Sequence, residues 1–433
     1  MFFKTNLRIL LLGLTVMLSF LCACDAGNGD DTVIEPAEDV PVLVFADNGK
    51  TNFSVIRAEE PDIYTFETAV AVYKKLKNTY SGDFSLTDDW LGPNANPAET
   101  GYELLLFETA RAESNAAMED LAAADAAYVI RVTDEKIVVV GATPSASNEA
   151  LNCFFDLLEQ YTQNGVTALP VGLEITAGKS DVKEPDVGAL LAAGRTVHAS
   201  FLDVFDYPYP RTDGFLDSQG AASDGSYVYF IMKKADGDRE VDRIFKIDMQ
   251  TWEIVAESEV LPLDHANDMT YDAQTHTHTL VVTNMYEHIV TLIDPDTLTV
   301  KETQTLPYGT YGVGYVGGDM PFFFLGYDGE NGLVMTDRSF DAMRTTPLAS
   351  AEGFTGQGMD ADSRYAYVPL SPGTEAYNKI QIYSLSDGEH LGDVMLDTTM
   401  ESETIFHVGE DFYIQFNHNG SKIARLMFYE PFA

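Results

Sequence analysis

The first half of the chain alternates between strand-like and helix-like spacing of its hydrophobic residues. Apolar runs at 52–57 and 102–107 predict strands, and runs at 128–132 and 136–140 predict a hairpin because only three turn residues separate them. Helical spacing predicts three helices in the intervening segments. They are expected at 66–76, 111–124 and 146–161. The order β-α-β-α-β-β-α predicts a small α/β sandwich, a sheet with helices against it, over residues 51–190.

From about residue 196 the helical spacing stops, and short aromatic-rich strands alternate with Asp/Gly turns. Residues 247–254 recur at 293–300, a shift of 293 − 247 = 46 residues. Repeats of this length with several strands each are typical of β-propeller blades. The same shift relates five positions: Gln219, His265, Tyr311, Gln357 and Glu403. Five related positions predict an all-β, five-bladed β-propeller over residues 196–433.

The last repeat is one strand short, because only five residues follow its third strand at 423–428. An unassigned extended segment, 196–204, precedes the first repeat. We expect this segment to supply the missing outer strand, which would join the two ends of the ring and leave no open sheet edge. The alternative is a six-bladed ring that recruits another segment.

Four segments of the α/β domain carry a resemblance to a known family: 102–106 (YELLL), 109–114 (TARAES), 128–132 (YVIRV) and 136–141 (KIVVVG). Across about residues 52–175 the chain resembles the small non-catalytic domain beside the catalytic barrel of hexosaminidases and α-glucuronidases. The resemblance implies a glycan-related setting and transfers no catalytic residue. In that family the domain packs against a (β/α)8 barrel, whereas the chain that follows here is predicted to be all-β.

The first residues resemble the signal of a bacterial lipoprotein. Lys4 and Arg8 precede an apolar run at 9–21, which is too short for an ordinary membrane span. The run ends in Leu21-Cys22-Ala23-Cys24, which resembles a lipobox, so residues 1–23 are interpreted as a signal peptide and Cys24 as the lipidated residue. The acid-rich segment 24–50 is predicted to be a flexible tether. A plain secretory signal is the alternative.

The order of lipobox, α/β domain and propeller resembles uncharacterised surface lipoproteins of anaerobic bacteria. That resemblance implies a lipid anchor at the cell membrane and a position on its extracytoplasmic face. No activity comes with it.

Composition narrows the possible partners. The chain has 26 Lys and Arg against 68 Asp and Glu, a formal charge of −42. Nucleic acid and anionic headgroups would be repelled, so the N-terminal lipid is the expected membrane contact. With Cys22 removed and Cys24 lipidated, Cys153 alone remains, so neither an internal disulfide nor a Cys-rich metal site is expected. No cofactor is predicted.

The candidate binding chemistry lies in the five repeat positions. The first strand of every blade lines the axis of a propeller, so their side chains are expected to converge at one mouth. Amide, imidazole, phenol and carboxylate groups together suit a polar ligand, and we expect a saccharide or a cell-wall glycan. Two alternatives remain: the ring residues only bond each other and water, or the outer faces serve as a protein–protein scaffold.

Catalysis at the same mouth is a further alternative. A glycoside hydrolase or lyase would use Glu403, with Asp268 or Glu401 as a second carboxylate and His265 as acid or base. Gln219 stands in the first blade where propeller glycosidases carry Asp-containing motifs, which favours binding without catalysis. No histidine spacing or Asp-rich turn has the ligand count of a recognised metal site.

Overall fold

The computed structural model describes residues 40–82, 85–90, 101–208, 214–236, 239–274, 278–327, 331–372, 376–417 and 421–433. The expected signal peptide, the lipidation residue Cys24 and most of the expected tether lie outside these ranges. The chain divides into two compact units, Met1–Lys183 with Phe432–Ala433, and Glu184–Pro431. Within the described ranges, no helix has the length and apolar character needed to cross a membrane.

The division between the units falls earlier than the expected boundary at 190–196. Helix α4, Val187–Ala192, belongs to the second unit. Its side chains Val187 and Leu191 pack in one apolar cluster with Val197. Residues four apart lie on the same side of a helix, so this segment forms a small apolar face and is not a linker.

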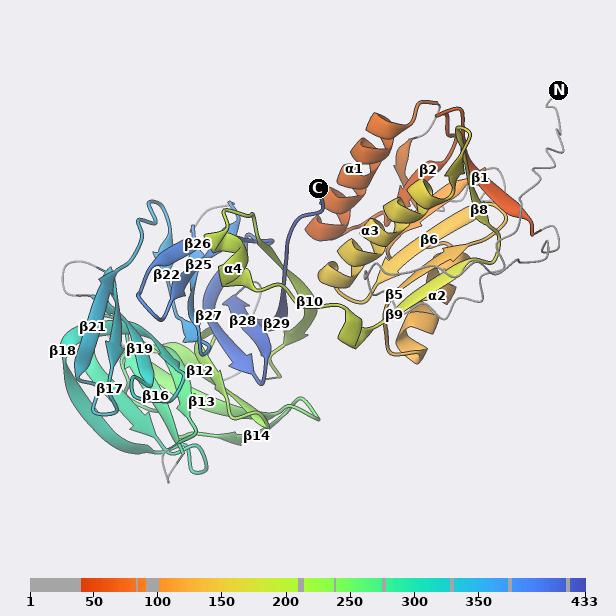
Figure 1. Ribbon diagram of the computed structural model, residues 1–433. Helices are drawn as coiled ribbons and strands as arrows, with labels where there is room; N and C mark the ends of the chain where they lie inside the picture. Colours follow the sequence, from red (N-terminus) through yellow and green to blue (C-terminus); the bar gives the residue numbers. More distant parts are fainter. Residues whose placement is uncertain are drawn as a thin grey trace. The chain divides into compact units, whose positions relative to one another are not determined.

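The first unit contains a six-stranded sheet in the order β3-β2-β4-β6-β5-β9 (Figure 1). β2 runs parallel to β3 and β4, and β4 runs parallel to β6, whereas β5 is antiparallel to β6 and β9. Every residue of β4 is buried, which matches its three consecutive leucines, and the buried Glu103 at its start forms an ion pair with Arg111. The strands are β2 (Ser54–Arg57), β3 (Leu86–Asp88), β4 (Glu103–Leu106), β5 (Ala126–Val132), β6 (Lys136–Gly141) and β9 (Glu174–Gly178).

Helices cover both faces of this sheet. α2 packs on the face that carries Leu105 and Val138, and Figure 1 shows α1 and α3 side by side on the other face. Asp62 and Thr143 cap α1 and α3 by accepting hydrogen bonds from backbone N–H groups in the first turn. The helices are α1 (Ile63–Thr79), α2 (Ala112–Ala123) and α3 (Pro144–Gln160), followed by a 3-10 turn, Lys179–Asp181.

A second, small sheet corrects the expected extent of the tether. β1 (Val42–Asp47) pairs antiparallel with β8 (Val166–Pro170), which also pairs with β7 (Thr162–Gln163). Leu43 and Phe45 of β1 are buried. The folded unit therefore begins before residue 50, because alternate apolar residues of this acid-flanked segment form a half-buried strand.

The second unit contains, in the described part of the chain, five successive four-stranded antiparallel groups. The first two groups use β11 (Asp217–Ser223), β12 (Tyr227–Asp236), β13 (Arg239–Asp248), β14 (Glu253–Glu257), β15 (Ala266–Asp272), β16 (Thr279–Asn284), β17 (Glu287–Ile293) and the beginning of β18 (Val300–Tyr315). The third and fourth use the end of β18, β19 (Phe322–Tyr327), β20 (Asn331–Thr336), β21 (Ala342–Pro347), β22 (Thr355–Gly356) with β23 (Asp360–Ala361), β24 (Tyr365–Ser371), β25 (Asn378–Ser384) and β26 (His390–Leu396).

The fifth group closes the unit. β27 (Glu401–Val408), β28 (Asp411–Asn417) and β29 (Ser421–Tyr429) are completed by β10 (His198–Asp206), which pairs antiparallel with β29. This confirms the predicted pairing of the segment before the first repeat with the last one. The inner strands are neighbours in the order β11, β15, β18, β23, β27 and back to β11. The unit is therefore a propeller-like β fold with its first strands around an axis.

Candidate functional site

A β-bulge recurs near the beginning of the inner strands. The pairing with the second strand slips within 218–221, 266–268, 310–312 and 402–404. In the fourth group, Gln357 lies between the paired residues Gly356 and Asp360. Bulged residues leave the ladder, so the recurrence puts one residue of each group at the same point of what we call the ring mouth. These residues are Gln219, Asn267, Tyr311, Gln357 and Glu403.

The second group departs from the predicted ring, because Asn267 and not His265 occupies the bulge. Asp264 and His265 both have left-handed backbone, with φ of 55° and 71°. This turn displaces the ring position by two residues, which a constant shift of 46 misses. The His265 Nδ1 atom instead lies 2.5 Å from Oε2 of Glu240, and burial lowers the pKa of His265.

The ring residues bond to neighbouring groups of the protein. The amide Nδ2 of Asn267 donates to the carbonyl of Tyr311 at 2.6 Å and to the carbonyl of Gln357. The amide Nε2 of Gln415 donates to the carbonyl of Gln219 at 2.5 Å. These bonds join the second group to the third and fourth, and the fifth group to the first, and they hold the bulged backbone in place, which is a structural use of polar side chains.

Asp268, a predicted candidate for catalysis, closes the axis. Its Oδ2 accepts hydrogen bonds from the backbone N–H groups of Val313 and Met359, each at 2.9 Å, and its Oδ1 accepts from the Thr404 hydroxyl at 2.6 Å. Burial raises the pKa of Asp268 to about 8, although these three bonds lower it. A Cβ on Gly358 would lie 2.9 Å from the Asp268 carboxyl carbon. The Asp268 side chain therefore links the third, fourth and fifth strand groups through Val313, Met359 and Thr404.

Glu403 is buried at the ring mouth beside an exposed carboxylate. Burial raises the pKa of Glu403 to about 8, and the negative charge of Glu401 adds to the shift. Asn417 donates to Oε1 of Glu403 at 2.8 Å. Glu401 is exposed, and its Oε1 accepts from Nε2 of Gln357 at 3.4 Å. Gln357 and Glu401 are thus polar groups of the ring mouth that solvent reaches.

Three tyrosines lie together at the same mouth. Tyr286 and Tyr327 are each 44 % exposed, with ring centroids 5.1 Å apart, and Tyr286 lies 5.6 Å from the buried ring of Tyr311. Tyr327 pairs with Gly309 of β18, where a Cβ would lie 2.8 Å from the carbonyl oxygens of both exposed tyrosines. The glycine thus allows the close approach that brings the rings together. We call Tyr286, Tyr311 and Tyr327 the tyrosine platform.

The repeat does not predict Tyr286 and Tyr327, because the two residues are not one repeat apart: Tyr286 lies directly before β17, and Tyr327 is the last residue of β19. A usable signal is present all the same. Each is an aromatic residue followed directly by an acidic one in the sequence, Glu287 or Asp328.

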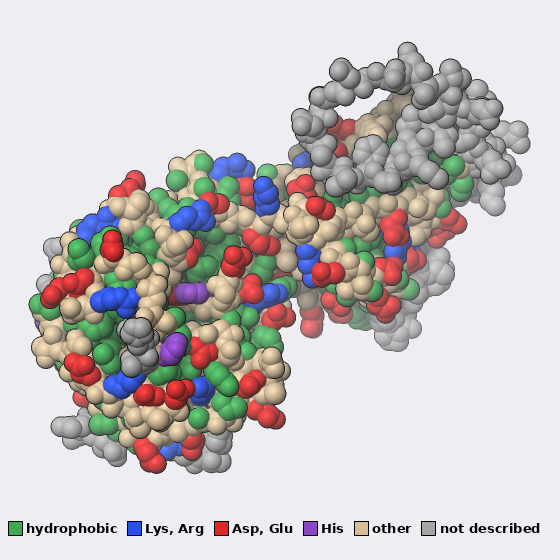
Figure 2. Space-filling model, turned by 60° about the horizontal axis from the view of Figure 1, so that its bottom comes forward, with side chains coloured by type: hydrophobic (Ala, Val, Ile, Leu, Met, Phe, Trp, Pro, Cys, Tyr) green, Lys and Arg blue, Asp and Glu red, His purple; other side chains and the backbone are tan. Residues whose placement is uncertain are grey.

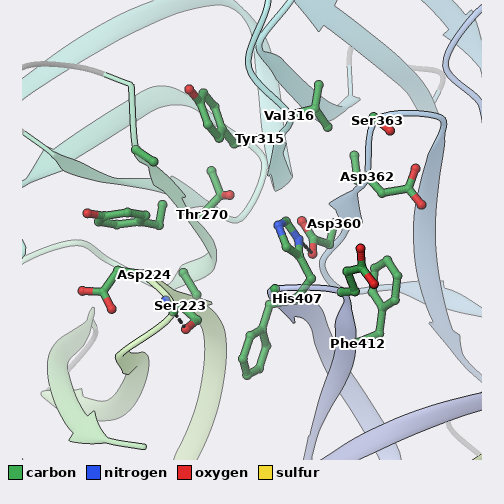
Figure 3. A pocket seen from close by; sticks show the side chains of 18 of the residues that line it. Ser223, Asp224, Thr270, Tyr315, Val316, Asp360, Asp362, Ser363, His407 and Phe412 are labelled. Carbon is green, nitrogen blue, oxygen red and sulfur yellow. Dashed lines mark hydrogen bonds and ion pairs between the residues drawn. The ribbon is translucent and has the colours of Figure 1, made fainter. Parts of the chain in front are cut away.

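A cavity of about 750 Å³ opens where the inner strands end, which we call the pocket mouth (Figure 3). All five strand groups contribute to its wall, but none of the five predicted ring residues does. His407 and Asp360 form an ion pair there, with 2.6 Å between Nδ1 and Oδ2. Sequence repetition alone gave no indication of this pair.

Metal binding finds no support at either mouth. Across the described ranges, no group of three or more His, Cys, Asp or Glu side chains could hold a metal ion. Acidic turns use their carboxylates locally: Asp294 accepts from the backbone N–H groups of Asp296 and Thr297 at 2.9 and 3.0 Å. Figure 2 shows carboxylates spread over the face turned forward, with Lys and Arg between them.

Comparison with known proteins gives limited likeness. No protein-family model matches the sequence, and no curated protein matches it. Among solved structures, the chain is similar to a glutaminyl cyclase of Myxococcus xanthus, with a TM-score of 0.40 and 11% identity over 54% of this chain and 97% of that one. It is also similar to the hydrazine synthase of Kuenenia stuttgartiensis, with a TM-score of 0.32 and 10% identity over 48% of this chain and 57% of that one. Likeness of this size carries no argument about function.

Proposed function

We propose that the protein is a lipid-anchored binding protein whose five-bladed propeller holds a saccharide or a cell-wall glycan at the ring mouth. The tyrosine platform carries this proposal, because two half-exposed rings are present at the same mouth as the exposed Gln357–Glu401 pair. A sugar ring has an apolar face and an edge of hydroxyl groups. Aromatic faces and amide or carboxylate groups are the matching chemistry.

The charge of the chain restricts the glycan. With a formal charge of −42, the protein repels polyanions at long range. Neutral glycans are therefore favoured over polymers of acidic sugars. A platform open on one side also suits an internal segment of a polymer, since the chain can continue in both directions beyond the contact.

The anchor belongs to the same proposal. Lipid on Cys24 would hold the two units on the extracytoplasmic face of the membrane, and the first unit would serve as the accessory domain that it resembles. Cys24→Ser is expected to leave the membrane fraction while Cys22→Ser stays in it. The reverse pattern would contradict the lipobox.

A second candidate function, glycan hydrolysis, is favoured by one observation. Glu403 is buried with a raised pKa of about 8, and the exposed Glu401 lies within electrostatic reach. Glycosidases use two carboxyl groups, one of which has a raised pKa and acts as the acid. His265 and Asp268 give this function less support, because their side chains are engaged with Glu240 and with the axis.

A glycan array with the purified full-length protein tests the proposal. We expect binding of at least one neutral glycan, and a loss of about fivefold or more in Tyr286→Ala and in Tyr327→Ala, since each removes a stacking contact of about 1 kcal/mol. Phe66→Ala is the matched control, because Phe66 is 45 % exposed but lies on α1 in the other unit. Binding by no glycan, or equal loss in the control, would overturn the proposal. Release of shortened products would favour hydrolysis.

A further inference from the structure

We infer that the pocket mouth is a second binding site, for a small uncharged hydroxylated molecule the size of a mono- to trisaccharide. The inference does not depend on the proposed function of the ring mouth, because neither the bulged ring residues nor the tyrosine platform lines this cavity. Its cavity of about 750 Å³ is within the range of small-molecule sites.

The His407–Asp360 pair supplies a fixed hydrogen-bond donor to this cavity. Asp360 is buried, whereas 39 % of the His407 side chain is exposed. The charge of Asp360 and its hydrogen bond raise the pKa of His407 to about 9, against the effect of burial. The ring nitrogen Nε2 has no protein partner in the part of the chain that the structure describes. A protonated imidazole held in this way donates to whatever occupies the cavity.

Two aspartates of the wall have their carboxylates engaged in turns. Asp224 accepts from the N–H groups of Ser226 and Tyr227 and from the Tyr229 hydroxyl, all at 2.8 Å. Asp362 repeats this arrangement in the fourth group, with the N–H groups of Arg364 and Tyr365 and the Tyr367 hydroxyl. These carboxylates shape the turns and leave little capacity for general acid or base work on a ligand. The site is therefore one for binding.

The balance of charge in the wall disfavours an anionic ligand. Asp224, Asp360, Asp362 and Glu410 face only two cationic side chains, Arg364 and His407. Arg364 is already held by Asp186, with 2.5 Å between Nη1 and Oδ2. An anion would meet this excess of carboxylates, and an ammonium group would meet the charged imidazole.

Hydroxyl and aromatic side chains of the cavity wall also suit a hydroxylated ligand. Figure 3 shows the His407 ring beside Asp360, with Thr270 and Tyr315 on another side of the cavity. Thr270 is largely buried, and its hydroxyl has no protein partner among the described residues. A ligand hydroxyl can accept from His407 and pair with Thr270, while Tyr315 and Phe412 offer aromatic surface to its apolar face.

The test isolates the pocket from the platform. Saturation-transfer NMR and calorimetry are run on full-length Tyr286→Ala/Tyr327→Ala protein with glucose, galactose, mannose, N-acetylglucosamine, cellobiose, sorbitol and glucuronate. We expect at least one neutral probe to bind, and glucuronate to bind more weakly than glucose. Thr270→Val should weaken binding about fivefold and His407→Gln about tenfold.

Thr303→Val is the matched control, because Thr303 is an exposed threonine of an outer strand. Thr270→Val keeps the shape of the side chain, so it remains informative if His407→Gln folds poorly. Binding by no neutral probe, tighter binding of glucuronate, or equal binding by Thr270→Val and the control would each overturn the inference. Loss of glycan-array binding in the platform variant alone bears only on the ring mouth.

Discussion

The ring mouth and the pocket mouth are built from opposite ends of the same five inner strands. Side chains of the protein fill the axis at the ring mouth, whereas a cavity opens at the pocket mouth. At the ring mouth, bulges place large polar residues such as Asn267 and Glu403 around the axis, and Asp268 ties three groups together beneath them. At the pocket mouth, the wall includes the small or short side chains of Ser223 and Thr270. The backbone register at the two ends thus differs: bulges turn polar side chains toward the axis at the ring mouth, and the cavity opens at the other end.

The comparison also separates two uses of polar residues. The amides and carboxyl groups nearest the axis are hydrogen-bonded to other strand groups of the protein. A ligand at the ring mouth would therefore contact the residues at its rim, where Tyr286 and Tyr327 are exposed. In the pocket, Asp224 and Asp362 accept hydrogen bonds from their own turns, whereas the Thr270 hydroxyl and Nε2 of His407 have no partner among the residues that the structure describes. A repeated polar position is therefore a poor guide to a ligand unless its bonding is known.

The largest expected effect is on the axis. Asp268→Ala removes the acceptor of two N–H groups and one hydroxyl that remain buried, which should lower the free energy of unfolding by about 3 kcal/mol or more. Urea titration measures this, with Thr303→Val as the control. A loss below about 1 kcal/mol would mean that Asp268 does not hold the groups together.

A methyl group added next to the Asp268 side chain should also destabilise the fold. In Gly358→Ala the new Cβ would lie 2.6 Å from Oγ1 of Thr404 and 2.9 Å from the Asp268 carboxyl carbon. Overpacking of this kind costs about 1–3 kcal/mol, measurable as a lower urea midpoint. An unchanged midpoint would show that the axis has room to spare.

A pair of variants tests which residue of the second group belongs to the ring. Asn267→Ala removes the donor to the buried carbonyl group of Tyr311 and to the part-buried carbonyl group of Gln357, and should cost about 1–2 kcal/mol. His265→Ala should cost less than about 1 kcal/mol, because its partner Glu240 is partly exposed. Thermal and urea unfolding of both proteins give the comparison. A greater loss of stability in His265→Ala than in Asn267→Ala would support the predicted ring, in which His265 is the residue of the second group.

The smallest effect is a pH dependence at the pocket mouth. The pKa of His407 is raised to about 9, so the folded protein holds the proton more tightly than the unfolded chain does. The resulting stabilisation is complete below about pH 6.5 and is lost as the pH rises through about 9, and solvent screening limits it to about 1 kcal/mol. Unfolding measured between these pH values should show this slope, and His407→Gln should flatten it. If the pH dependence of stability is unchanged in His407→Gln, it arises from the titration of another side chain.

Much of the fold follows from the sequence because the relevant signals are local. Helices α2 and α3 lie within two residues of the expected ranges, and β10 corresponds to the extended segment that the repeat left unassigned. Strand β1 and helix α4 were not predicted. Both are short apolar runs, VLVFAD and VGALLA, but they stand in an acid-rich and a Gly/Ala-rich segment whose composition is typical of a tether and a linker.

The site was less predictable for two physical reasons. Equal spacing locates Gln219, Tyr311, Gln357 and Glu403 correctly at the bulges, but the left-handed turn before Asn267 shifts one repeat by two residues. The His407–Asp360 pair joins residues 47 positions apart, close to one repeat, yet neither residue recurs in other groups. Pairing across neighbouring groups is a property of the assembled ring and has no signature in a single repeat.

Titration of the glycan selected by the array into wild-type and Tyr286→Ala/Tyr327→Ala protein tests the central claim most directly. We predict that the double variant binds about tenfold or more weakly while its unfolding midpoint is unchanged, since both rings are half exposed and contribute to the ligand contact more than to the core. Equal dissociation constants for the two proteins would contradict recognition of a glycan at the ring mouth.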